Sequence, residues 1–100
     1  MAFVSLRAWR TRSAERAVLA RDLKAAFAAA LGLSADDALT VNEIACADPG
    51  CADVETVVLV MRAGEPTRAI RLPAPMDAIG DGHHRALVEE ERALRRAGAG

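Results

Sequence analysis

The segment Val-Glu-Thr-Val-Val-Leu-Val-Met at residues 54–61 constrains the fold more than any other part of the chain. It is rich in β-branched residues and apolar at both alternating sets of positions, which is typical of a central strand. Two further strand-like segments flank it, residues 39–45 before it and residues 67–72 after it. Short connections rich in turn residues separate the three segments, so the sequence predicts an antiparallel three-stranded meander in order 1-2-3. Because Val41 and Ile44 are an odd number of residues apart, we expect a β-bulge in the first strand.

Helical patterns lie on both sides of the strand region. The first has apolar residues at the three-and-four spacing of an amphipathic helix, with Ser13 as N-cap and Gly32 just past its end, and predicts a helix over about 14–31. Asp81 is the preferred N-cap of a second helix, with Asp77 as the competing start. The predicted fold class is therefore α+β, in the order α-β-β-β-α, with two helices on one face of the sheet.

At 100 residues the chain is long enough for one domain with one core. We expect that domain over residues 13–97, a basic N-terminal arm over residues 1–12 and a frayed tail over residues 98–100. The arm is either an extra helical turn or a flexible segment, and either its tryptophan closes over the edge of the core or it docks on a partner. In the second helix, acids at 89–91 precede bases at 92–96, which predicts a solvated face with a pair between Glu91 and Arg95.

The two cysteines of the chain, Cys46 and Cys51, bracket the turn Ala-Asp-Pro-Gly between the first two strands. Proline and glycine suit the second and third positions of a β-turn, so a four-residue hairpin loop would set the two thiols opposite each other. Their β-carbons would then lie roughly 5 Å apart, a separation that suits metal ligation or, after adjustment, a disulfide. Two packed thiols beside a turn are the simpler alternative.

A metal site at this turn needs further ligands. His83 and His84 are the remaining histidines, and a histidine at the start of a helix is disfavoured as a cation and so available as a ligand. Nearby oxygen ligands would come from Asp48, Asp53 or Glu55. We expect zinc at Cys46, Cys51, His83 and His84 as a possible cofactor; two thiolates alone underfill tetrahedral zinc, which favours a labile or partner-shared site.

Charge and composition exclude several classes of function. The formal net charge is −1 and the chain has three aromatic residues and no tyrosine, which argues against nucleic-acid binding. The exception would be a strip formed by Arg62, Arg68 and Arg71. We expect no transmembrane segment, because charged residues interrupt each apolar run, and the same interruptions break a secretory signal and predict a cytoplasmic protein. No phosphate-binding loop, nucleophile elbow or metalloprotease motif is present, which favours a non-enzymatic role.

The chain has a pattern of Cys-x4-Cys followed by Glu55-Thr56-Val57, and later Arg71-Leu-Pro73. This set of residues resembles small uncharacterised bacterial proteins with the same cysteine hairpin. The resemblance implies that the hairpin is a recurring unit and implies no function.

The function expected from the sequence is a small cytoplasmic accessory or interaction protein with a thiolate metal site at the Cys46/Cys51 hairpin. Helices on one face alone would leave valines of the central strand exposed on the other, which predicts a protein partner or a homodimer. A metal-free adaptor or homodimeric subunit that uses this sheet face is therefore the first alternative. A dithiol redox protein is the second.

Overall fold

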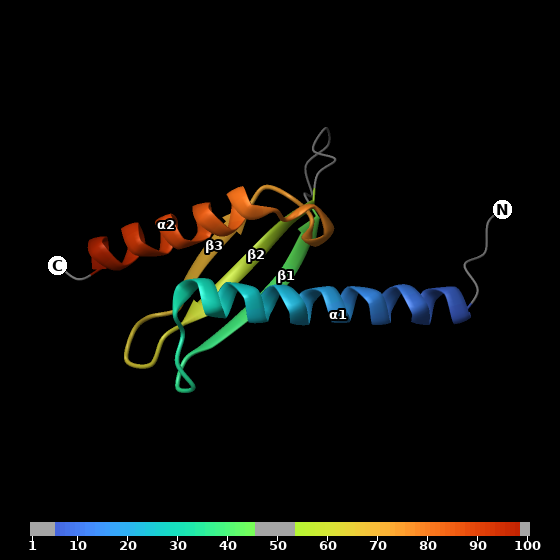
Figure 1. Cartoon of the computed structure of the whole chain (residues 1–100), viewed down its shortest axis with the longest axis horizontal. Coiled ribbons are helices and arrows are strands. Elements are labelled where there is room, and N and C mark those ends of the chain that lie inside the picture. Colours follow the sequence, from blue (N-terminus) through green and yellow to red (C-terminus); the bar gives the residue numbers. More distant parts are fainter. Residues whose placement is uncertain (1–5, 46–53, 99–100) are drawn as a thin grey trace.

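The computed structural model describes residues 6–45 and 54–98, with side chains described from Arg10 onward in the first helix. The elements follow one another as α1 (Leu6–Leu31), β1 (Ala38–Ala45), β2 (Val54–Met61), β3 (Arg68–Leu72), the short 3₁₀ helix η1 (Met76–Ala78) and α2 (Asp81–Gly98). The sheet is antiparallel, with β2 between β1 and β3. Both helices cover the same face of the sheet (Figure 1). The predicted α+β fold and strand order are confirmed.

The register of the strands decides which side chains meet the helices. Leu39 pairs with Val60, and Val58 pairs with Ile70. Directly opposed residues of an antiparallel pair project from the same face, so these four side chains share the helix-facing side. All four are buried in one cluster with apolar residues of both helices, β3 and η1, namely Leu23, Phe27, Leu31, Leu72, Met76 and Leu87. The core therefore lies between the sheet and the two helices.

Strand β1 contains no bulge, contrary to the expectation from its sequence. Its register with β2 runs without a skipped residue from the pair Ala38 and Met61 to the pair Ala45 and Val54. The imperfect alternation has a different cause, because Val41 faces the helices whereas Ile44 projects from the opposite face and is 49% exposed. In the sequence, an apolar residue on the outer face breaks the alternation of apolar and polar residues in the same way as a bulge would.

Helix α1 begins at Leu6 rather than near residue 14, so the predicted helix start is wrong. Ser13 lies inside the helix and does not cap it. The predicted apolar stripe begins only at Val18, and for that reason the preceding turns showed no amphipathic signal. Of the two forms considered for the arm, residues Leu6–Arg12 take the helical one, continuous with the rest of α1.

The end of α1 follows the sequence prediction. Gly32 has a φ of +66°, a conformation that side chains with a β-carbon rarely adopt. The backbone N–H of Leu33 donates to the carbonyl of Ala28 at 3.0 Å, and that of Gly32 donates to Ala29 at 3.2 Å. These two hydrogen bonds form a Schellman motif, which satisfies helix-terminal carbonyls and turns the chain toward β1.

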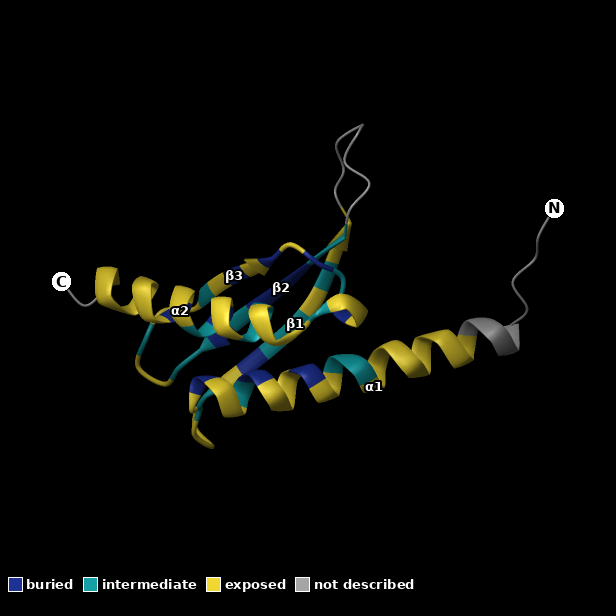
Figure 2. Cartoon of the chain, turned by 45° about the horizontal axis from the view of Figure 1, so that its top comes forward, coloured by how far each residue is buried: buried dark blue, intermediate teal, exposed yellow. Residues whose placement is uncertain are grey.

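The N-terminal half of α1 extends past the edge strand β1, away from the rest of the molecule (Figure 1). The residues from Arg10 to Val18 are all exposed, whereas the C-terminal half of the helix carries Leu23, Phe27 and Leu31 into the core (Figure 2). Most helical stability in proteins comes from tertiary packing, and a helix of about 13 residues without it is marginal in water. Over its described side chains, the projecting half of α1, residues 6–18, therefore has less packing support than the C-terminal half.

Candidate functional site

The sulfur half of the predicted metal site, Cys46 and Cys51, lies outside the described residues. The described strands on either side pair Ala45 with Val54 as their last pair. The opposed-thiol geometry expected from the sequence stays a prediction.

His83 caps the start of α2. The backbone N–H of Gly80, the residue before the helix, donates to His83 Nδ1 at 3.0 Å. A side chain that reaches back from the third helical position to the N–H of the N-cap residue is one half of a capping box. The carbonyl of Gly80 in turn accepts hydrogen bonds from the N–H groups of His83 and His84, at 3.0 and 3.2 Å. His83 therefore uses one of its two ring nitrogens to hold the helix start.

His84 packs between the two helices. Its ring centroid lies 4.8 Å from that of Phe27 in α1, with the ring planes at 54°. The side chain is half-buried and also borders a shallow hollow with Asp81 and Arg85. Tilted aromatic contacts at this distance stabilise packing by about 1 kcal/mol beyond the buried area. The structure thus separates the two histidines into a helix cap and a helix–helix contact.

Within residues 6–45 and 54–98 no group of three or more histidine, cysteine, aspartate or glutamate side chains is arranged to hold a metal ion. Of the predicted oxygen ligands, Asp48 and Asp53 lie outside these ranges, and Glu55 lies 3.6 Å from Arg71 in an ion pair. Metal ligation by Cys46 and Cys51 stays a prediction. Any zinc site would need the cysteines together with ligands from outside the described residues, from a partner, or from a histidine released from its present contact.

A buried ion pair ties both helices to the sheet, and the sequence analysis missed it. The guanidinium of Arg62, the residue after β2, donates to Glu91 of α2 through Nε at 2.7 Å and through Nη2 at 3.0 Å. Nη2 also donates to the carbonyl of Leu31 at the end of α1, at 2.7 Å. Glu91 is only 2% exposed. The hydrogen bonds between Arg62 and Glu91 raise the pKa of the Arg62 guanidinium above its ordinary value, so Arg62 remains cationic.

This ion pair corrects two expectations. Glu91 does not belong to a solvated face and does not pair with Arg95, which instead donates to Glu65 at 3.0 and 3.1 Å. The arginine strip is also absent, because Arg62 and Arg68 are engaged with Glu91 and Glu65 beside the helices. Arg71 alone projects from the other face of the sheet. A clue was available, since Glu91 lies four residues after the core residue Leu87 and hence on the same side of α2.

Acidic side chains also organise the turns at the same end of the sheet. Asp37 accepts hydrogen bonds from the backbone N–H groups of Ser34 at 2.8 Å and Ala63 at 2.9 Å, and these bonds lower its pKa. Glu65 accepts hydrogen bonds from Arg95 and Arg68, which lower its pKa in the same way. The connections before β1 and after β2 are therefore held by carboxylates in their charged form.

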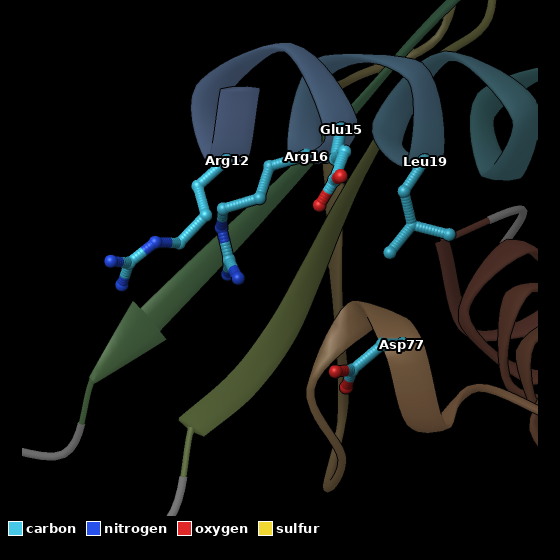
Figure 3. Close-up of a pocket in the computed structure, with 5 residues that line it drawn as sticks. All are labelled: Arg12, Glu15, Arg16, Leu19 and Asp77. Atoms are coloured by element: carbon cyan, nitrogen blue, oxygen red, sulfur yellow. The ribbon is translucent and has the colours of Figure 1, made fainter. Parts of the chain in front are cut away.

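A shallow hollow of about 290 Å³ lies between α1 and η1 (Figure 3). Arg12, Glu15, Arg16 and Leu19 of α1 point toward it from one side, and Asp77 of η1 lies on the other. Arg16 forms an ion pair with Glu43 of β1, whose other carboxylate oxygen accepts from the backbone N–H of Met76 at 2.8 Å. Both signs of charge surround the hollow and already pair in part, so it has no chemistry that selects a ligand.

The face of the sheet opposite the helices has no described element over it (Figure 1). The central strand presents Val57, Leu59 and Met61 there, and β1 adds Ile44. Val57 is 8% exposed, Leu59 and Met61 are half-buried and Ile44 is exposed. The sequence predicted several exposed valines on this face. That prediction is mostly wrong, because Val58 and Val60 point into the core on the other face. We refer to these four residues, Ile44, Val57, Leu59 and Met61, as the open sheet face.

Comparisons with protein-family models, with curated proteins and with solved structures found no match to this chain. The resemblance to small bacterial proteins with a cysteine hairpin stays a prediction. Among the described residues, neither helix has a stretch long and apolar enough to cross a membrane.

Proposed function

We propose that this chain is a small cytoplasmic interaction domain that binds another protein through the open sheet face. The observation that supports this proposal is the apolar surface of β2 and β1 opposite the helices, which none of the described elements covers. Contiguous apolar surface on a soluble domain is typical of a protein interaction site.

Its charged surroundings suit a protein partner. The ion pair of Glu55 with Arg71, at 3.6 Å, lies on the same side of the sheet and is largely solvent-accessible. An apolar centre beside charged and polar side chains is the usual anatomy of a protein interface. The hollows beside η1 and beside His84, in contrast, are shallow and lined by charges of both signs, which makes a small-molecule site there a weaker interpretation.

The size of the face sets the expected strength of binding. Two strands of eight residues and one of five, at about 3.3 Å per residue and about 4.8 Å between strands, give a footprint of roughly 330 Å². A stable interface needs roughly 800 Å² from each partner. The open sheet face of one chain therefore supports a weak or transient contact unless the partner reaches beyond the sheet.

Site-specific photo-crosslinking in cells tests this proposal. A photoreactive residue at Leu59 or Met61 should give one discrete cross-linked species, whereas the same residue at Arg92, exposed on α2, should not. Leu59→Glu should abolish the species formed from position 61 without changing the thermal unfolding midpoint by more than a few degrees, because Leu59 lies outside the core cluster. Equal cross-linking from positions 61 and 92, or cross-linking that persists in Leu59→Glu, would contradict a role for this face.

A further inference from the structure

The outer edge of β1 is unusually open for pairing with another strand. β1 is an edge strand of eight residues, and its uninterrupted register with β2 shows that no bulge distorts it. Natural proteins protect such edges with proline, lysine, a bulge or a very short strand. β1 contains no proline or lysine, and its one charged residue, Glu43, is engaged by Arg16 and by the N–H of Met76.

The projecting half of α1 lies at the same edge. It passes over β1, where Arg16 forms an ion pair with Glu43, and continues beyond the sheet with the residues from Arg10 to Val18 exposed. Among the described elements, no strand lies beside the outer edge of β1, on the side toward which α1 projects. Within the described residues, the fold thus has an unpaired strand edge and a projecting helix on the same side of the sheet.

We propose that a second copy of this chain fills this place, with β1 paired antiparallel to the partner's β1 about a two-fold axis. Such pairing joins the two sheets into one of six strands with all helices on one side. The axis relates the two α1 helices as antiparallel neighbours, so that the projecting half of each lies beside the C-terminal half of the other. One arrangement therefore pairs the edge and supports the exposed turns of both chains.

Charge favours this occupant. The projecting half carries Arg10 and Arg12, whereas α1 ends in carbonyl groups and is followed by Asp36 and Asp37. Antiparallel packing brings the basic end of each helix to the negative pole and acidic turn of the other. In such a dimer the basic end of α1 in one chain lies beside the acidic turn after α1 in the other. A chain of net charge −1 can therefore associate with itself through opposite charges.

The register follows from the requirement that opposed residues share a face. For a strand of residues 38–45, a central two-fold axis must then pass at position 41 or 42. An axis at Val41 sets Thr40 opposite the partner's Asn42 on the outer face. Thr40 Oγ1 is, among the described residues, the buried side-chain polar atom without a hydrogen-bond partner, and an opposed amide would supply one. We therefore place the axis at Val41.

Disulfide trapping tests this register in a Cys46→Ser/Cys51→Ser background. A mixture of Thr40→Cys and Asn42→Cys chains should form a 40–42 disulfide between chains on mild oxidation, because directly opposed β-carbons lie about 5 Å apart. Ala69→Cys, on the same face of the sheet but in β3, is the matched control and should not cross-link with either chain. Cross-linking of Ala69→Cys as readily as of the mixture would overturn the β1 interface.

Mass in solution and a charge swap complete the test. Sedimentation should give twice the chain mass of 10.6 kDa. Arg10→Glu should raise the dimer dissociation constant about tenfold, since two-fold symmetry alters the contact twice, and adding Asp36→Arg should restore it. Arg96→Glu, on the exposed side of α2, should have no effect. A monomer at all concentrations up to the millimolar range would overturn the proposal. Leu59→Glu should leave the dimer intact, and this variant therefore distinguishes the β1 interface from binding through the open sheet face.

Discussion

At the scale of single residues, the Arg62–Glu91 ion pair is the contact on which the arrangement of elements depends most. One guanidinium holds the end of α1, the end of β2 and the middle of α2 together. Removing one member of a buried pair leaves the other charge without compensation, whereas removing both avoids that cost. The burial of either charge therefore depends on the other.

Substitution of this pair gives a direct prediction. Glu91→Leu should lower the free energy of unfolding by about 3 kcal/mol, because the Arg62 cation is left unpaired in a largely buried place. Arg62→Met/Glu91→Leu should lose less than the single variant, and Glu90→Leu, exposed on the same helix, should change stability by about 0.5 kcal/mol or less. Urea unfolding measures all three. A double variant less stable than Glu91→Leu would contradict the argument.

The cysteines supply the second residue-scale prediction. If Cys46 and Cys51 ligate zinc, protein purified under reducing conditions without chelator should contain metal near one atom per chain or per dimer, and Cys46→Ser/Cys51→Ser should contain none. Elemental analysis measures this. His83→Ala provides the matched test of a histidine ligand, because loss of metal in that variant would show that His83 leaves its cap when metal binds. Protein that takes up no zinc on reconstitution would remove the metal hypothesis.

At the scale of elements, the two helices owe their ends to different devices. α1 ends in a Schellman motif built on Gly32, and α2 begins with Gly80 as N-cap and His83 as the residue that reaches back to it. Glycine at an N-cap has no side-chain acceptor. The hydrogen bond to His83 is therefore the one side-chain hydrogen bond of this capping motif. The start of α2 thus depends on an imidazole nitrogen that accepts a hydrogen bond.

The cap predicts how substitutions at His83 behave. His83→Ala should reduce the free energy of unfolding by about 0.5–1 kcal/mol, whereas His83→Glu should retain most of it, since a carboxylate at this position also accepts from the N-cap N–H. Arg85→Ala, an exposed neighbour in α2, is the control. Thermal unfolding followed by circular dichroism measures the series. Equal loss in the alanine and glutamate variants would show that the hydrogen bond is not what stabilises the helix start.

At the scale of the whole molecule, carboxylates in their charged form hold the turns that connect the sheet to the helices. Hydrogen bonds to Asp37 and Glu65 lower the pKa of each below its ordinary value, 3.8 and 4.5. A carboxyl group whose pKa is lower in the folded state stabilises the protein above its unfolded pKa, and this contribution disappears as the pH falls through the folded pKa. Stability should therefore decrease on acidification below about pH 4.5, the unfolded pKa of the higher of the two.

Variants separate these two groups from general acid denaturation. Asp37→Asn and Glu65→Gln should each be less stable than the parent chain at pH 7 and should show a smaller decrease between pH 5 and pH 3, because the titrating group is absent. Urea midpoints measured across this range test the expectation. An acid dependence identical to that of the parent chain in both variants would show that other carboxylates are responsible.

The sequence by itself determined the order of elements, the strand boundaries to within one residue and the end of the first helix. These features rest on local physics: β-branched runs, turn residues and a glycine at a left-handed position. The same local patterns placed the start of α2 to within one residue, although the N-cap is Gly80 and the predicted N-cap, Asp81, is the first helical residue. They failed at the start of α1, because its exposed turns carry no apolar stripe for a pattern to detect.

Only the tertiary structure decided how side chains from distant elements meet. Arg62 and Glu91 are far apart in the sequence, and the register of β2 together with the position of α2 brings them into contact. The same register divides the arginines between the two faces of the sheet. The packing of α2 against α1 places His84 beside Phe27, while His83 accepts a hydrogen bond from Gly80 at the helix start. Periodicity reports which face a residue occupies within its own element, whereas a contact depends on the placement of two elements, which no single element encodes.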